Sequence, residues 1–392
     1  MSKTQLETSG NVNRSSLSQL AMLFLRLGAT AFGGPAAHIA MMEDEIVRRR
    51  RWMTREEFLD LLGATNLIPG PNSTEMAIHI GHRQAGWIGL LVAGLSFIFP
   101  AVAIVTAIAW AYVRYGSLPE VAGALYGVKP VIIAVVVQAL WSLARAAIKN
   151  KFLAFVGIAG VALTLLGIHE LLILLGGGLF AGIRQLIRQK LKNGQLHSLI
   201  SVSPFALLLE ATAPTAATFG LWPLFLFFLK VGAVLYGSGY VLLAFLRADL
   251  VERWHWLTEA QLLDAIAVGQ VTPGPVFTTA TFIGYVLGGA KGATVATVGI
   301  FLPAFFFVAV SGPLVPRIRR SPTAGAFLDG VNAASMALML VVSYQLGRAA
   351  LVDLFTLAFA CLSAILLFRF RINSVWLIIG GAIAGWMLYG PN

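Results

Sequence analysis

Apolar residues fill most of this chain in long stretches that alternate with short charged ones. Four such stretches, at about 86–113, 121–145, 152–168 and 171–187, are long enough for a helix across the hydrocarbon core of a bilayer. An earlier stretch, about Leu17–Met42, is interrupted by Gly33-Gly34-Pro35, which predicts a kink or an unwound turn there. The pattern therefore predicts an all-α, polytopic membrane protein.

A Pro-Gly-Pro sequence breaks the apolar pattern at two places. These two breaks consist of Pro69, Gly70, Pro71, Pro273, Gly274 and Pro275. No regular helix continues through them, because each proline lacks an N–H group and clashes with the preceding turn. Non-helical backbone at membrane depth is tolerated only inside protein or beside an aqueous cavity. Two breaks in corresponding places are typical of a transporter's binding site.

A short helix is predicted on each side of the first break. Thr54 and Glu57 form a capping box that starts the helix leading into it, and Ser73–Ile80 can resume the helix afterwards. Each arm is much shorter than the ~20 residues that a span needs. We therefore expect a re-entrant hairpin. The alternative is that both arms span fully, which gives twelve crossings in the whole chain.

The second part of the chain repeats the first. An offset of 204 residues aligns Arg26 with Lys230, Gly33 with Gly237, Trp52 with Trp256, Thr54 with Thr258, Asp60 with Asp264, and Thr74 with Thr278. After a one-residue deletion, an offset of 203 aligns Gly89 with Gly292, Pro100 with Pro303, Pro119 with Pro322, and Arg145 with Arg348. We expect a polar segment at 1–16, repeats at 17–190 and 221–392, and a linker at 191–220. The pattern does not place residues 203–220.

Arginine and lysine residues lie in different, non-equivalent loops in the two repeats. After its third apolar segment the first repeat has only Arg114, whereas the second has Arg317, Arg319 and Arg320. After the fourth segment the first repeat has Arg145, Lys149 and Lys151, whereas the second has only Arg348. By the positive-inside rule the repeats have inverted topology, with about five spanning helices and one re-entrant hairpin each. The arginines at 48–51 then lie on the cytoplasmic side.

Composition supports a membrane protein and limits its partners. The 392 residues are 58% hydrophobic and 11% charged, whereas soluble domains carry about a quarter charged residues. The net charge of +11 comes from loop arginines and lysines that set topology and meet anionic lipid, so no nucleic-acid partner is predicted. No cleavage-like site follows the first apolar run, so we expect no removable signal peptide. The single cysteine, Cys361, is expected to face lipid or to be packed.

Two cations are the first candidates for a substrate site. Arg26 and Lys230 lie at equivalent positions, roughly nine residues into otherwise apolar helices. A cation at that depth costs about 2.5–3.5 kcal/mol on insertion scales and normally faces a cavity or a partner. The pair is predicted to bind an anion. The alternatives are snorkelling to the membrane interface, or an internal ion pair between Arg26 and Glu75.

The hairpin tips are the second candidate. A helix that starts after each break directs unpaired N–H groups and a partial positive charge at the break, which favours an anion. The residues predicted to bind substrate there are Asn72, Ser73, Thr74 and Thr278, with Asn66 and Gln270 on the entering arms. The alternative is that these groups satisfy only one another.

Glu75 and His79 follow the first break alone, because the second repeat has Thr279 and Ile283 at these positions. A charged acid would repel an anion, so we predict that the two residues couple transport to protons. The alternative is a salt bridge from Glu75 to Arg26 or Arg83.

Other polar residues carry weaker expectations. Asp60 and Asp264 are interpreted as helix-start or interhelical bonding groups, and Lys129 is a minor candidate for the site. The sequence has no metal-ligand cluster, phosphate-binding glycine loop or nucleophile elbow, so no enzyme activity, metal or cofactor is predicted.

Several long motifs resemble the chromate ion transporter (CHR) family in its long, two-domain form. They are Phe32–Pro35, Arg50–Trp52, Asn66–Glu75, Phe228–Gly232 and Val271–Pro275. The resemblance implies a carrier of the bacterial inner membrane that exports chromate, confers chromate resistance, and is driven by the membrane potential or the proton gradient. Its partners would be chromate or a sulfate-like oxyanion, protons and lipid, and a homodimer is compatible with it. The alternatives are a transporter of sulfate or another oxyanion, and a non-transporting membrane sensor or scaffold.

Overall fold

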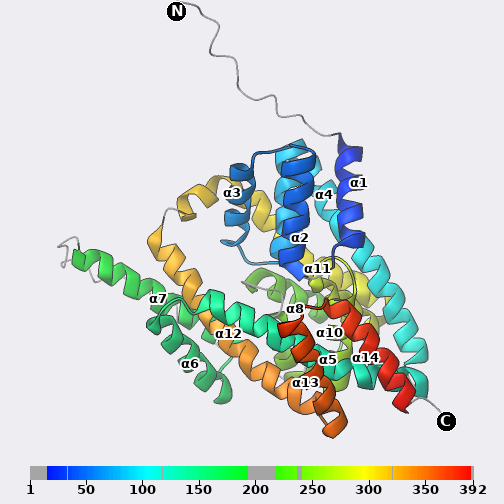
Figure 1. The fold of residues 1–392 in the computed structure, drawn as a ribbon. Coiled ribbons are helices and arrows are strands. Elements are labelled where there is room, and N and C mark those ends of the chain that lie inside the picture. Colours follow the sequence, from blue (N-terminus) through cyan, green and yellow to red (C-terminus); the bar gives the residue numbers. More distant parts are fainter. Residues whose placement is uncertain are drawn as a thin grey trace, which may run out of the picture.

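The computed structural model describes residues 16–32, 34–116, 118–192, 218–235, 241–319 and 321–389, and their regular elements are all helices (Figure 1). The first repeat contains α1 (Leu17–Thr30), α2 (Gly34–Glu43), η1 (Asp44–Arg49), α3 (Arg55–Thr65), α4 (Asn72–Tyr115), α5 (Pro119–Ala147), α6 (Lys151–Leu165) and α7 (Glu170–Lys192). The second contains α8 (Leu221–Val234), α9 (Leu242–Phe245), η4 (Leu246–Arg253), α10 (Glu259–Val271), η5 (Val276–Thr278), α11 (Thr279–Arg319), α12 (Pro322–Ala350), α13 (Leu354–Arg369) and α14 (Ser374–Tyr389). Most of the predicted linker, together with Gly33 and Gly237, lies outside the described residues.

α4 is bent back on itself. Gly86 has a φ of +61°, outside the helical region, and Gly81 lies against the carbonyl of Gly89. Residues eight apart in one straight helix would be separated by roughly 12 Å, so the chain must reverse between them. α4 therefore consists of two antiparallel arms, residues 72–84 and 87–115. The first arm is longer than the predicted Ser73–Ile80.

α11 has the same construction at equivalent positions. Gly289 has a φ of +60°, and Gly284 lies against the carbonyl of Gly292. A left-handed conformation disfavours residues with a Cβ atom, which explains a glycine at each reversal.

α3 and the first arm of α4 form the predicted hairpin. The capping box is present, with the Thr54 N–H donating to Glu57 Oε2 at 2.8 Å. Arg83 forms an ion pair with Glu57, and Gln84 Nε2 donates to the Trp52 carbonyl at 3.1 Å. The start of α3 and the end of the arm therefore lie together, with the proline break at the far end. The re-entrant placement of the hairpin in a bilayer stays a prediction.

The equivalent helices α5 and α12 run antiparallel. Tyr126, near the start of α5, donates to Asp353 just after the end of α12. Lys149, just after the end of α5, contacts Asp329 near the start of α12, with an Nζ–Oδ1 distance of 2.7 Å. Helices that match in sequence but run in opposite directions are what inverted repeats produce.

The two repeats also exchange their last helices. α5 packs on α13 and α14, and reciprocally α12 packs on α6 and α7 (Figure 1). Small residues permit the closest of these contacts, because the Cα of Gly127 on α5 lies against the backbone of Gly381 and Gly385 on α14. The repeats therefore form one interlocked body.

Five helices are long and apolar enough to cross a membrane, counted over the described part of the chain: α4, α5, α7, α11 and α12. Shorter apolar helices accompany them, among them α1 and α8. α6 ends at Leu165, earlier than the predicted 168, because Gly167 takes a left-handed conformation with φ +76°. Cys361 on α13 is exposed, which is the lipid-facing alternative rather than the packed one. The fold is that of a multi-pass membrane protein.

Candidate functional site

Each proline break contacts the opposite repeat. The Gly70 N–H donates to the carbonyl of Leu235 at 2.8 Å, at the end of α8. The Gly274 N–H donates to the carbonyl of Ala31 at 3.0 Å, at the end of α1. Ala31 and Leu235 are equivalent residues with extended backbone after their helices. The two breaks and the two helix ends therefore form a reciprocal pair of contacts, which we call the crossing contacts.

Both crossing contacts require glycine. Gly70 has a φ of +139° and Gly274 a φ of +92°, which side chains of L-residues rarely adopt. Gly70 faces the Ala304 methyl group on α11, and Gly274 faces the equivalent Ala101 methyl group on α4. The breaks therefore pack against the long arms at their midst, with no room for a side chain.

The threonines at the two tips differ. Thr74 is fully buried, and its hydroxyl has no hydrogen-bond partner among the described residues. Thr278 is also buried, but its Oγ1 donates to the Pro275 carbonyl of its own tip at 2.8 Å. The predicted donors are thus not equivalent, since the second tip satisfies its own hydroxyl.

The remaining predicted tip residues lie on both sides of the breaks. Asn72 Nδ2 donates to Asn66 Oδ1 at 2.8 Å, which links the two arms of the first hairpin. Ser73 is buried in the first turn of α4, and Gln270 is partly buried near the end of α10. The structure therefore places all four at the hairpin tips, as the sequence predicts, while their role in binding stays a prediction.

Glu75 lies directly against the first break. Its side chain is fully buried, one carboxyl oxygen touches Gly70, and neither oxygen has a hydrogen-bond partner among the described residues. The alternative salt bridges are not formed, because Arg26 pairs with Glu45 and Arg83 pairs with Glu57. An ionised carboxylate in this position would be costly, so the neutral acid fits the site better.

Two histidines accompany this acid in the first repeat. His79, one turn after Glu75, is buried, and its Nε2 has no partner among the described residues. His38, on α2, was not singled out from the sequence. Its Nε2 donates at 3.0 Å to the Ala31 carbonyl, which also accepts from Gly274. The available signal was a histidine in an apolar run just after a glycine–proline break.

The predicted cations each lie in a cluster of charged residues. Glu45 lies between Arg26 and Arg49, at 3.2 Å from Arg49 Nη1, and Arg49 Nε lies 2.7 Å from Asp44. The arginines at 48–51 are predicted only to set topology, but Arg49 also pairs with the neighbouring carboxylates. The partner of Arg26 is therefore Glu45, not Glu75.

The second repeat has the same cluster at the same offset. Lys230 Nζ lies 2.6 Å from Asp249, which also pairs with Arg253. Asp249 aligns with Glu45, as Arg253 does with Arg49. A further carboxylate from another helix, Glu170 on α7, lies 2.9 Å from Arg253. The first cluster joins α1 to η1, and the second joins α8 to η4 and, through Glu170, also to α7.

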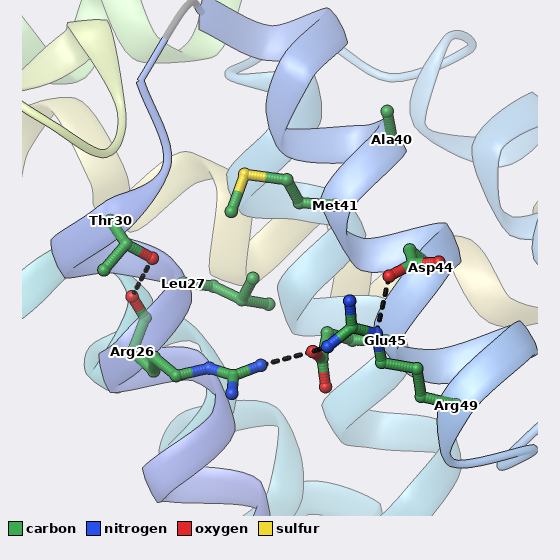
Figure 2. Close-up of a pocket in the computed structure, with 8 residues that line it drawn as sticks. All are labelled: Arg26, Leu27, Thr30, Ala40, Met41, Asp44, Glu45 and Arg49. Atoms are coloured by element: carbon green, nitrogen blue, oxygen red, sulfur yellow. Dashed lines mark hydrogen bonds and ion pairs between the residues drawn. The ribbon is translucent and has the colours of Figure 1, made fainter.

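The first cluster opens into a cavity of about 440 Å³. Its lining residues are Arg26, Leu27, Thr30, Ala40, Met41, Asp44, Glu45 and Arg49. Figure 2 shows the guanidinium groups of Arg26 and Arg49 converging on Glu45 from two different helices. The Arg26 side chain is 51% exposed, so it faces this space rather than protein.

The cavity leads towards a crossing contact. Thr30 lines it and directly precedes Ala31, which holds Gly274. Arg26 lies five residues before Ala31, roughly 7.5 Å along a helix. The lining carries two guanidinium groups and two carboxylates, so a small anion would enter here by displacing a carboxylate from the arginines.

The amino-acid sequence is similar to a family of known proteins. The sequence pattern described as "Chromate transporter" matches residues 18–183 and again residues 222–386, which confirms the duplication. A chromate transport protein of Cupriavidus metallidurans is 32% identical over 95% of this chain and 93% of the relative. One from Pseudomonas aeruginosa is 33% identical over 96% and 93%. An uncharacterized transporter of Methanocaldococcus jannaschii is 24% identical over 96% and 95%.

No solved structure matches this chain. The family pattern covers both repeats, including both proline breaks and both charge clusters. This chain therefore belongs to the chromate transporter family.

Proposed function

We propose that this protein is a secondary active transporter of a tetrahedral oxyanion, with chromate as its substrate. It exports chromate across the bacterial inner membrane and so confers chromate resistance. The observation that carries the proposal is the cavity in which Arg26 and Arg49 share the carboxylate of Glu45, beside the crossing contact between Ala31 and Gly274. Relatives named as chromate transport proteins support the substrate and a transport role rather than an enzymatic one.

The first charge cluster suits a dianion. Glu45 already bridges Arg26 and Arg49 through one oxygen, Oε1, so these two cations are arranged to share an anionic oxygen. Arginine favours such paired contacts with oxyanions. An oxyanion in the cavity would compete with Glu45 for the same two guanidinium groups. Sulfate has the same shape and charge as chromate and is the second candidate substrate.

Glu75 is the proposed coupling residue, with His79 beside it. It is buried against Gly70, so any movement of the first break changes the environment of its carboxyl group. In the closed contact the acid is neutral; when the break separates and water enters, it releases its proton. Proton movement would then accompany movement of the anion.

Chromate flux in proteoliposomes tests the proposal. Purified protein should move labelled chromate in response to an imposed pH difference or membrane potential, and unlabelled sulfate and molybdate added in excess measure the selectivity. Arg26→Gln should lose most of the flux at normal abundance. A protein that moves no oxyanion under any gradient would instead be the sensor or scaffold.

A further inference from the structure

The entering helix of the hairpin is packed differently in the two repeats. In α10, the six residues Leu262–Ala267 are all buried. The aligned residues of α3 are Phe58–Gly63, of which only Phe58 is buried, and Leu59 is 46% exposed. Both helices pack on α4 and α11, but α10 packs on α5, α12 and α14 as well. The two repeats thus share a sequence pattern but occupy two different positions in the fold.

A charged contact holds α10 in its buried position. Asp264 Oδ1 lies 3.4 Å from Lys129 Nζ on α5. The Tyr112 hydroxyl, on the long arm of α4, donates to Asp264 Oδ2 at 2.9 Å. Both partners come from the first repeat, so this contact joins the second hairpin to the opposite half.

The segment before α10, η4, also contacts helices outside its own hairpin. Arg253 reaches Glu170 at the start of α7, and Arg247 Nη1 donates to Gln345 on α12 at 2.7 Å. A cavity of about 350 Å³ is lined by residues of η4 and of helices α6, α7 and α12. These polar contacts close the second repeat over the exchanged helices.

In the corresponding segment of the first repeat, Arg49 and Arg55 pair with carboxylates close to them in the sequence. Arg49 pairs with Asp44 and Glu45, and Arg55 Nε lies 3.3 Å from Glu43. The cavity on this side is the open one that contains Arg26. One side of the molecule is therefore closed and the other open.

We infer that the contact between Asp264 and Lys129 is a gate, and that Asp60 forms the corresponding gate with α12 in the opposite conformation. The inference rests on the proposed transport function. In inverted repeats, exchanging the two conformations produces the state that opens to the other side. Asp60 aligns with Asp264, and Asn332 on α12 aligns with Lys129. Asp60 therefore docks beside Asn332 when the carrier reverses.

The loop charges assign the two sides. The arginines at 48–51 lie beside the open cavity on the first repeat, and the positive-inside rule places them in the cytoplasm. The structure is thus open to the cytoplasm, and the Asp264 gate closes the outer side. This is the state that an exporter needs in order to load its substrate.

The two gates differ in charge. Asp264 faces a lysine, whereas Asp60 would face the neutral Asn332 amide. Opposite charges attract strongly inside a protein, and a carboxylate facing a neutral amide lacks this attraction. The cytoplasm-open state is therefore the more stable state of the free carrier, in agreement with the structure.

Reversible crosslinking tests the outer gate. In a Cys361→Ser background, Lys129→Cys and Asp264→Cys are combined and treated with a short bis-methanethiosulfonate. We expect the crosslink to form without substrate and to abolish chromate flux in proteoliposomes. Reductant should cleave the crosslink and restore the flux. Phe152→Cys with Phe180→Cys is the matched control, because these rings lie 5.3 Å apart on α6 and α7, away from the gate. Its crosslink should leave flux unchanged.

The inner gate is tested with Asp60→Cys and Asn332→Cys. This pair should crosslink more when an outward chromate gradient drives turnover than at rest. In a separate variant that keeps Asp60, Asn332→Lys gives this aspartate a cationic partner, so it should lower crosslinking between Lys129→Cys and Asp264→Cys. Both changes report a shift to the outward-open state.

The outcomes separate the two proposals. If wild-type protein moves no chromate, the transport function fails, whatever the crosslinks do. If wild-type protein transports and the Lys129–Asp264 crosslink forms but leaves flux unchanged, the gate is overturned. If the Asp60 and Asn332 cysteines never crosslink while the control pair does, the inner gate is overturned.

Discussion

The first and second repeats share the same backbone structure at their proline breaks but differ in the side chains around them. Both breaks use a glycine N–H to hold the opposite helix end. Around the first break lie Glu75, His79 and the Thr74 hydroxyl, all buried with atoms that lack partners among the described residues. Around the second, Thr279 donates to its own tip at Val276, 2.8 Å away. Duplication supplied a two-sided scaffold, and divergence placed the titratable groups on one side of it.

That difference separates two kinds of residue. Groups present in both repeats, such as the glycines and the charge clusters, serve the shared geometry. Groups present in one repeat, such as Glu75, are the ones to which we assign the proposed proton transfer. Experiments on matched positions can therefore test each assignment, because every first-repeat residue has a natural control 203 or 204 positions later.

The largest expected effect concerns the membrane topology of the two repeats. Single cysteines near Lys149 and Arg319 should be labelled only from the cytoplasm, and those near Glu170 and Leu351 only from outside. The contact between Lys149 and Asp329 already places the end of α5 beside the start of α12. Labelling of Lys149 and Arg319 positions from opposite sides would contradict the inverted arrangement in the membrane.

Next in size are the paired cations. Arg26→Gln and Lys230→Gln should each lower chromate flux on the order of tenfold or more, since loss of one strong charged contact of about 1.4 kcal/mol already gives a factor of ten. Removing Lys230 leaves Asp249 with Arg253 as its partner, so the protein should remain folded. Flux and membrane abundance are measured together. Normal flux with both cations replaced would show that they only reach the interface.

Glu75 should give a smaller but more specific effect. Glu75→Gln imitates the neutral acid, so it should bind chromate normally and lose the dependence of flux on the pH difference at clamped voltage. Glu75→Asp should retain weaker coupling. Thr279→Val, at the aligned position, is the control and should keep the full dependence. A glutamine variant that responds to pH as the wild type does would place the coupling elsewhere, with His38 and His79 as the next residues to replace.

The smallest effects are expected at the reversal glycines. Gly86 and Gly289 have φ near +60°, with open space where a side chain would be added. Alanine at either position should lower stability by about 1–2 kcal/mol through backbone strain alone, and equally in both repeats. Thermal unfolding in detergent measures this. Unequal losses would show that the two reversals contribute differently to stability, just as α3 and α10 are packed differently.

The sequence by itself determined the features that follow from local chemistry. Proline chemistry located both breaks, the capping boxes started α3 and α10, and the loop arginines predicted the inversion that the antiparallel α5 and α12 display. Aligned residues such as Arg26 and Lys230 exposed the duplication. These properties depend on neighbouring residues or on fixed offsets, so a pattern can reveal them.

Only the tertiary structure decided which groups meet. Arg26 pairs with Glu45 rather than Glu75, and His38 joins the Ala31 carbonyl, because α2 and η1 fold back along α1. The exchange of helices between repeats was equally invisible in the pattern. The burial of Asp264 against Lys129, with Asp60 exposed, could not be predicted, since both repeats carry the same local signals. One sequence pattern supports both positions of the hairpin, and long-range packing selects between them.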